Sequence, residues 1–346
     1  MSEQLSLPQL GWQPFFQQQI SLEEFESCTM ARVIGQQRSL IALLTTQGRR
    51  SLPLSPSVAE LVVGDWILLD AENRFTRLLE RLSLFSRKAA GAKVATQLIA
   101  ANINTLFIVS SMNQDFNLNR LERYLSLAND AGVDPVILLT KADLCEDRQA
   151  YIEQAQLLGP TQEILILNSL QPENVRQLTA WCSTGKTIAF LGSSGVGKST
   201  LINTLLGDTL QQTQAIREDD AKGRHTTTSR SLHPLATGGL LLDTPGMREL
   251  QLAACEHGVE ETFAEIALLA SHCRFADCQH QSEPGCAVRA AIEAGTLHER
   301  RLNNYLKLMR EQAFNSATLA EKRANDRKFA RHVRTVVNSK RKEKNG

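Results

Sequence analysis

Residues 187–200 read TIAFLGSSGVGKST, and this stretch decides the fold. An apolar run leads into Gly192, four residues separate it from Gly197, and Lys198 and Ser199 follow before the helix-forming segment LINTLLG. A strand, a glycine-rich turn and a helix in this order form a P-loop. Its backbone N–H groups turn inward around phosphates, and the helix N-terminus favours negative charge. We therefore predict a nucleotide phosphate site between a buried strand and a helix.

The residues of the P-loop have separate expected roles. Lys198 is expected to neutralise the β- and γ-phosphate oxygens, and the Ser199 hydroxyl is expected to bind the Mg²⁺ that accompanies the nucleotide. The other nucleotide contacts are assigned to Gly192, Ser193, Ser194, Gly195, Val196, Gly197 and Thr200. A glycine-rich turn without a ligand is the alternative, but the motif coincides with the predicted strand and helix.

A second motif of the phosphate site follows the strand pattern GGLLL, which ends in Asp243, Thr244, Pro245 and Gly246. A carboxylate at the end of a strand beside a P-loop can complete the protein's share of the Mg²⁺ shell, so we assign this role to Asp243. The Gly246 N–H is expected to contact the γ-phosphate.

Residues 208–230 connect the two motifs and contain GRHTTT. A polar loop in this place is typical of a switch, in which one threonine binds Mg²⁺ and the γ-phosphate and releases both after hydrolysis. Any of the three threonines can fill this role, and Thr227 is the middle one.

Met247, the residue after Gly246, cannot orient an attacking water, so slow intrinsic turnover is expected. His225 is the candidate for positioning that water, against the alternative of an ordinary exposed histidine.

Base selection is assigned to VILLTKADL, where Thr140, Lys141, Ala142 and Asp143 follow a strand as the guanine-reading Asn-Lys-x-Asp motif does. A carboxylate at Asp143 can accept from guanine N1–H and the exocyclic amine, whereas adenine offers neither donor. Lys141 can lay its stem along the base plane. Thr140 stands in place of the usual Asn and lacks its second polar contact, so modest affinity is expected. An ordinary helix start with Asp143 near the N-cap is the alternative.

The order of the motifs is unusual, because Thr140 precedes Gly192 by 52 residues and most GTPases have the opposite order. A binding site depends on adjacency in space. Joining the old chain ends and opening the chain elsewhere therefore reorders the motifs without losing a contact. In such a circular permutation, the loop after EILIL supplies the second base contact, which we assign to Ser169.

The rest of the chain divides into recognisable parts. Residues 30–85 hold short extended runs at strand-like intervals, which fit a small β-barrel or sandwich. From Asn104 strands and helices alternate, as in an α/β domain with a mostly parallel sheet. Beyond Cys255 no strand pattern is left, and residues 290–312 are predicted to be helical.

A metal site is indicated by CRFADCQHQSEPGC at residues 273–286. Cys273, Cys278, His280 and Cys286 offer three thiolates and an imidazole. These complete a tetrahedral zinc shell without a position for water, so one structural Zn²⁺ is expected. His272 competes as a ligand, but its adjacency to the first cysteine makes simultaneous binding awkward.

Composition and charge argue against a fibrous, a low-complexity or a membrane-spanning protein. The 346 residues are 42% hydrophobic and 22% charged, which indicates a globular chain, and no apolar run reaches 18 residues. We expect a cytoplasmic location and no membrane partner. The net charge of +1 conceals ten Lys and Arg against two acidic residues in 322–346, a tail suited to polyanions such as RNA.

With these motifs in view, the chain resembles the RsgA/YjeQ family of circularly permuted GTPases that assist maturation of the small ribosomal subunit. The resemblance rests on TKAD, GSSGVGKST, GRHTTT, DTPG, LFSRKAAG at 84–91 and the zinc spacing. It implies an N-terminal OB-fold, a GTPase centre, a C-terminal zinc domain, and GTP hydrolysis stimulated by the small subunit.

The sequence thus predicts a multidomain α/β protein. An N-terminal extension followed by a β-barrel (OB-fold) is expected over residues 1–88, a circularly permuted P-loop GTPase domain over 89–252, and a zinc-binding helical domain with a basic tail over 253–346. The expected partners are GTP or GDP and the small ribosomal subunit with its rRNA, and the chain is expected to be a monomer. A P-loop ATPase or small-molecule kinase and an RNA-binding scaffold with a vestigial nucleotide site are the alternatives.

Overall fold

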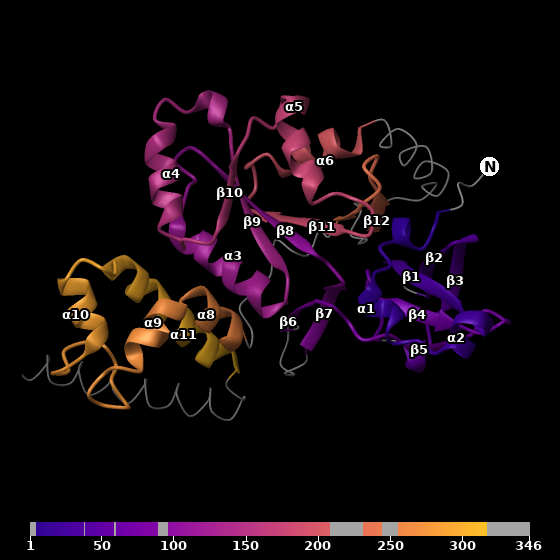
Figure 1. Cartoon of the computed structure of the whole chain (residues 1–346), viewed down its shortest axis with the longest axis horizontal. Helices are drawn as coiled ribbons and strands as arrows, with labels where there is room; N and C mark the ends of the chain where they lie inside the picture. Colours follow the sequence, from indigo (N-terminus) through magenta and orange to yellow (C-terminus); the bar gives the residue numbers. More distant parts are fainter. Residues whose placement is uncertain are drawn as a thin grey trace, which may run out of the picture.

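The computed structural model describes residues 5–37, 39–58, 60–88, 96–207, 231–243 and 255–316. Figure 1 shows a small β domain, a central α/β domain and a helical unit arranged side by side. Within the described ranges, no helix is long and apolar enough to cross a membrane.

The central domain is built on a six-stranded sheet with the order β10-β9-β8-β11-β13-β12. Its strands are β8 (Thr105–Ser111), β9 (Asp134–Thr140), β10 (Glu163–Ile166), β11 (Thr187–Gly192), β12 (Ser231–Pro234) and β13 (Leu240–Asp243). Every neighbouring pair is parallel except β12 and β13. The mostly parallel sheet predicted from the alternating pattern is therefore confirmed.

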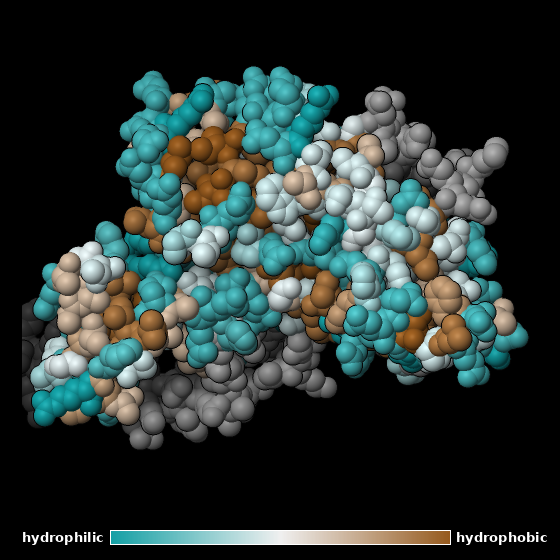
Figure 2. Space-filling view, in the orientation of Figure 1, coloured by the Kyte–Doolittle hydropathy of each residue, from teal (hydrophilic) through white to brown (hydrophobic). Residues whose placement is uncertain are grey.

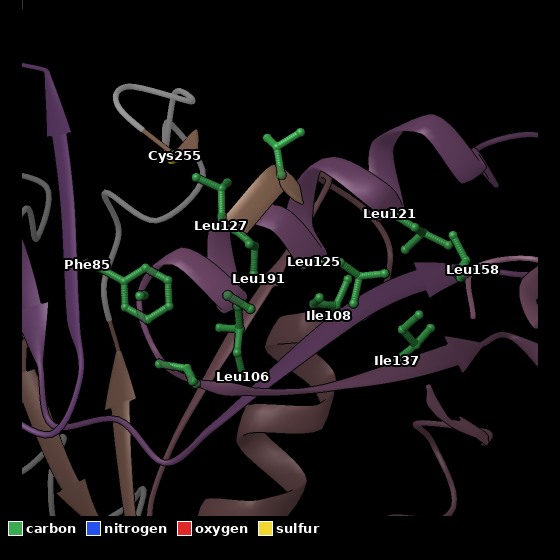
Figure 3. Packing of buried hydrophobic residues seen from close by; sticks show 14 of the residues in the cluster. Phe85, Leu106, Ile108, Leu121, Leu125, Leu127, Ile137, Leu158, Leu191 and Cys255 are labelled. Carbon is green, nitrogen blue, oxygen red and sulfur yellow. The ribbon is translucent and has the colours of Figure 1, made fainter. Parts of the chain in front are cut away.

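Helices cover both faces of this sheet, which is why β8 and β11 are buried along their whole length. One face carries α3 (Leu118–Asp130) and α4 (Arg148–Gln156), and the other carries α5 (Pro172–Val175) and α6 (Lys198–Leu206). Alternate residues of β8 divide between the two cores: Leu106 and Ile108 join the first, Phe107 and Val109 the second. Figure 3 shows the first of these cores.

β10 stands at one end of the sheet, and three of its four residues are only half-buried. Figure 2 shows apolar side chains gathered on the surface between α4 and α5, over this end of the sheet. The outer surface of α4 itself is hydrophilic.

The N-terminal domain is an antiparallel sheet of five strands with the order β3-β2-β1-β4-β5. The strands are β1 (Thr29–Gln36), β2 (Leu40–Thr45), β3 (Gly48–Pro53), β4 (Trp66–Leu69) and β5 (Phe75–Leu78). A five-stranded sheet of this kind fits the partly open barrel of an OB-fold. Its interior holds alternate residues of β1, β2 and β4, such as Ala31 and Val33.

The outer face of this sheet is covered by the chain that precedes it, including α1 (Pro14–Gln17). The following helix, α2 (Leu22–Ser27), has no buried residue and pairs with β5 through Glu24 and Arg77. Leu10, Trp12 and Phe16 pack on the outer face against Trp66 and Leu68 of β4. The sequence analysis assigned no structure to this segment.

A buried arginine joins the N-terminal domain to the central sheet. Arg32 of β1 donates to the carbonyl oxygens of Leu10 (2.6 Å) and Asn102 (3.1 Å), and to the Oγ1 of Thr187 on β11 (2.8 Å). Between the two domains lies a hairpin of β6 (Leu84–Lys88) and β7 (Thr96–Ala101). The predicted domain boundary after residue 88 falls between these paired strands.

The C-terminal unit contains α8 (Glu256–Thr262), α9 (Ala264–Ala270), α10 (Ala287–Glu293) and α11 (Glu299–Ser316). The helical stretch predicted over 290–312 consists of the end of α10 and most of α11, and the two helices are separated near Gly295, which has a left-handed φ of 74°. Their apolar residues belong to the same core as α3 and the sheet, and Figure 3 shows Cys255 beside Leu127 of α3. The basic tail, 322–346, lies outside the described residues.

Candidate nucleotide site and metal centre

The P-loop joins β11 to α6, as the sequence predicted. Gly192, with φ of 155°, has no room for a side chain, because a Cβ would lie 2.3 Å from the carbonyl oxygen of Val109. Gly197 is left-handed, with φ of 98°, and caps the N-terminus of α6. Glycine is therefore required at both positions, for close packing at the first and for the backbone conformation at the second.

Lys198 is buried, and its ammonium is turned back onto the loop. Its Nζ donates to the carbonyl oxygen of Gly192 (2.6 Å) and to that of Ser193. These carbonyl oxygens hold the ammonium group at the strand end of the loop. It lies there beside the backbone N–H groups of the P-loop, which can bind a phosphate.

The base-reading segment meets the P-loop directly. Thr140, the last residue of β9, is fully buried, and its Oγ1 donates to the carbonyl oxygen of Val196 (2.6 Å) and approaches that of Ser110 (3.3 Å). Lys141 is left-handed, with φ of 59°, so the chain turns sharply after the strand. Ala142 is buried and Asp143 is exposed just beyond it.

The loop after β10 reaches the same place. A Cβ on Gly197 would lie 3.3 Å from Ser169 Oγ and 3.8 Å from Thr140 Oγ1. The Oγ1 of Thr204, on α6, also lies 3.4 Å from the Ser169 carbonyl oxygen. Loops that follow β9, β10 and β11 therefore converge at the carboxyl end of the sheet, where nucleotides bind in open α/β folds.

The expected Mg²⁺ ligands lie on neighbouring elements. Ser199 is exposed in the first turn of α6, and Asp243 is half-buried at the end of β13, which pairs with the P-loop strand. Ser194, Gly195 and Thr200 lie at the surface of the same loop, exposed or half-buried. The three remaining candidates, His225, Thr227 and Gly246, lie outside the described residues.

One contact of the P-loop was missed in the sequence analysis. Arg120, in the first turn of α3, donates from Nη1 to the hydroxyl of Ser193, and the same nitrogen is 3.2 Å from Asp115 Oδ1. The segment between β8 and α3 carries no recognisable motif, so only the fold brings this cation to the phosphate loop.

The four predicted zinc ligands form a compact group in which all ligand atoms lie within 4.8 Å of one another. The Sγ atoms of Cys273 and Cys286 are 3.9 Å apart, and they lie 3.6 and 3.5 Å from His280 Nδ1. A tetrahedral zinc ion places two sulfurs about 3.8 Å apart and a sulfur and a nitrogen about 3.5 Å apart. The donor set therefore fits zinc, with Cys278 as the fourth ligand. His272 points elsewhere and contacts the Leu268 carbonyl oxygen (2.9 Å).

A carboxylate organises the loop that carries these ligands. Glu283 accepts from the backbone N–H groups of Gln279 (2.9 Å), Gln281 (2.8 Å) and Ser282 (3.0 Å). These donors lower the pKa of Glu283 to about 2. The Glu283 carboxylate therefore helps to fix the conformation of this loop, and its hydrogen bonds do not involve the cysteine side chains.

Comparison with known proteins agrees with this geometry. The family model for the RsgA GTPase matches residues 78–253. The chain is 58% identical to the small ribosomal subunit biogenesis GTPase RsgA 2 of Vibrio parahaemolyticus, over 97% of this chain and 94% of that protein. It is 48% identical to the small ribosomal subunit biogenesis GTPase RsgA of Mesorhizobium japonicum, over 90% and 91%.

Solved structures show a similar fold. YjeQ from Thermotoga maritima has a TM-score of 0.62 at 22% identity and covers 82% of this chain and 98% of its own. YloQ, described as a circularly permuted GTPase, has a TM-score of 0.58 at 24% identity, with coverage of 82% and 94%. Together with the strand order, these matches confirm the predicted permuted fold.

Proposed function

Because the chain belongs to the RsgA GTPase family, we propose that it hydrolyses GTP in the biogenesis of the small ribosomal subunit. In finer detail, we propose that it acts late in maturation, binds the rRNA of the subunit, and couples subunit-stimulated hydrolysis to its own release. The observation that carries the nucleotide part is the hydrogen bond between Thr140 and Val196, because it joins the base-reading strand to the P-loop in spite of their reversed order.

In this proposal Asp143 accepts the two guanine donors, while Ser169 closes the opposite side of the base. The exposed position of Asp143 leaves its carboxylate accessible to a ligand. Lys198 exchanges the carbonyl oxygens of Gly192 and Ser193 for phosphate oxygens, which carry a full negative charge. The P-loop N–H groups hold the remaining oxygens.

Mg²⁺ would be held by Ser199 and Asp243, and it supplies charge neutralisation between the β- and γ-phosphates when bound. Thr227 and Gly246 are proposed to sense the γ-phosphate, and His225 to position the attacking water. Hydrolysis is proposed to be slow without the subunit, because Met247 has no group that can orient water.

The zinc ion is proposed to be structural. Three thiolates and one imidazole leave no open position, and few apolar residues are available in the loop between α9 and α10. The unit that zinc would hold together ends in α11, which leads to the basic tail. We propose that this tail and the N-terminal β domain contact rRNA phosphates, and that the protein acts in the cytoplasm, where such particles assemble. The monomeric state stays a prediction.

The decisive experiment measures GTP hydrolysis by the purified, zinc-containing protein with small subunits, with large subunits and with neither. We expect stimulation by the small subunit alone. Asp143→Asn should lose the preference for GTP over ATP, and Lys198→Ala should lose hydrolysis.

Other results would favour the alternatives. Equal turnover of ATP and GTP, or phosphate transfer to a metabolite, would favour an ATPase or a kinase. Binding to and release from the subunit that ignore both GTP analogues and Lys198→Ala would favour an RNA-binding scaffold.

A further inference from the structure

Helix α3 lies between the phosphate site and the C-terminal helical unit, and it contacts both (Figure 1). Arg120 in its first turn reaches the P-loop, and Glu122, two residues later, is fully buried against α11. Residues two apart on a helix point about 200° apart around its axis. The two side chains therefore leave α3 on nearly opposite sides.

At the P-loop end, Ser193 connects two cations. Its hydroxyl accepts from Arg120 Nη1, and its carbonyl oxygen accepts from Lys198 Nζ. Asp115 holds the same Arg120 nitrogen at 3.2 Å. The position of Arg120 therefore fixes the residue on which the phosphate-binding lysine rests.

At the other end, the Glu122 carboxylate is held by three side chains of α11. Arg300 donates to both carboxylate oxygens (2.9 and 3.0 Å), Arg301 donates to Oε1 (2.9 Å), and Asn304 donates to Oε2. A buried carboxylate that loses its partners is strongly unfavourable. α3 and α11 are therefore expected to move together.

A second ion pair and a close helix contact reinforce this joint. Arg123 of α3 pairs with Glu311 near the far end of α11. Gly258 of α8 packs so tightly on α3 that a Cβ there would lie 2.1 Å from the Ser126 carbonyl oxygen. The joint thus spans most of α3, whose 13 residues extend about 20 Å.

We propose that Arg120 is a positioning residue of the phosphate site, and that α3 makes its position depend on α11. Nucleotide state and the C-terminal unit are then coupled in both directions, since coupling between two sites is reciprocal. This inference rests on the proposed function for its ligand. The direct chain connection, residues 244–254, lies outside the described residues, whereas the α3 route consists entirely of described contacts.

The test is backbone hydrogen exchange of α11 in the full-length zinc-containing chain, with GDP and with a non-hydrolysable GTP analogue. In the wild type, exchange in α11 should differ between the two nucleotides by about two- to tenfold, the range for one net hydrogen bond. Arg120→Gln should abolish the difference while the chain still binds nucleotide. Arg120→Lys, which keeps the charge but not the fork, should restore part of it. Arg176→Gln, at an exposed position on the other face of the sheet, is the matched control.

A second experiment changes the α11 side of α3 and measures nucleotide affinity. Glu122→Gln keeps the shape of the side chain and removes its charge on the side of α3 opposite to Arg120. It should shift the ratio of GTP-analogue to GDP affinity by about two- to tenfold, and Arg120→Gln should shift it in the same direction. The double variant should shift it no further, because both changes interrupt one route.

The proposal is overturned if the α11 difference survives unchanged in Arg120→Gln, if Arg176→Gln abolishes it equally, or if the wild type shows no difference. It is also overturned if Glu122→Gln folds and keeps the wild-type affinity ratio. Failure of the proposed function would show separately, as adenine nucleotides that bind as well as guanine nucleotides. The same exchange comparison with ADP and an ATP analogue would then still decide whether α3 couples the two sites.

Discussion

Thr140 offers the sharpest test of the nucleotide site, because its hydroxyl is the direct link between the base-reading strand and the P-loop. The substitution Thr140→Val keeps the shape of the side chain and removes only the donor to the Val196 carbonyl oxygen, 2.6 Å away. The side chain is fully buried, so water cannot replace the lost hydrogen bond without opening the site.

The expected magnitude follows from that burial. Loss of a buried hydrogen bond with its partner left in place costs about 1–3 kcal/mol, so the free energy of unfolding should fall by about this amount. The P-loop, freed from β9, must also be ordered again when nucleotide binds. The Kd for GDP should therefore rise about five- to tenfold, which corresponds to about 1–1.4 kcal/mol.

Urea unfolding and titration with a fluorescent GDP measure the two effects separately. Thr161→Val, at an exposed position, is the control and should change neither quantity. Thr140→Asn provides the opposite change, since a carboxamide can keep the donor to the loop and offer a second polar contact to the base. It should tighten GDP binding. If Thr140→Val bound GDP with wild-type affinity, the assignment of this threonine to the nucleotide site would be refuted.

Three further predictions concern the P-loop and the zinc loop. Gly192→Ala places a methyl group 2.3 Å from the Val109 carbonyl oxygen, so we expect loss of measurable GDP binding in calorimetry, and retained affinity would contradict the close packing. Cys278→Ser should release zinc, measured as metal per chain, and should lower the midpoint of thermal unfolding. The pKa of Glu283 is lowered to about 2 in the folded chain. Its contribution to the free energy of unfolding is therefore complete above about pH 5 and is lost as the pH falls towards 2. The stability difference between wild type and Glu283→Gln in urea should follow that course, and a difference independent of pH would argue against the backbone hydrogen bonds.

The parts of the molecule that the sequence predicted correctly depend on local pattern. The strand, loop and helix of residues 187–206 follow from apolar periodicity and glycine spacing. The zinc ligands follow from the spacing of soft donors, because a short loop can bring ligands that are close in sequence around one metal ion. The residues of β3, GRRSLP, carry no strand signal of their own, because they are mostly exposed and lack the alternation of a half-buried strand.

Contacts between distant segments could not be predicted in this way. Nothing in the neighbourhood of Arg120 shows that it contacts residue 193, and nothing near Glu122 shows that three residues of α11 surround it. Both sit in a helix whose pattern indicates amphipathicity, and burial of a charge depends on partners about 180 positions away. The convergence of TKAD with the P-loop was predicted because a known binding chemistry required it, even though no local pattern specified it.

The three units of the chain are joined by buried charges, and this changes the meaning of the predicted boundaries. Arg32 of the N-terminal domain donates a hydrogen bond to Thr187 of the P-loop strand. Glu122 of the central domain forms ion pairs with Arg300 and Arg301 of the helical unit. Removal of the N-terminal domain would leave the Thr187 hydroxyl without the guanidinium that donates to it, and removal of the helical unit would leave Glu122 without its ion-pair partners. We therefore predict that cutting the chain at either predicted boundary destabilises the central domain. We also expect a movement of either outer unit to reach the strand or the helix that contacts the P-loop.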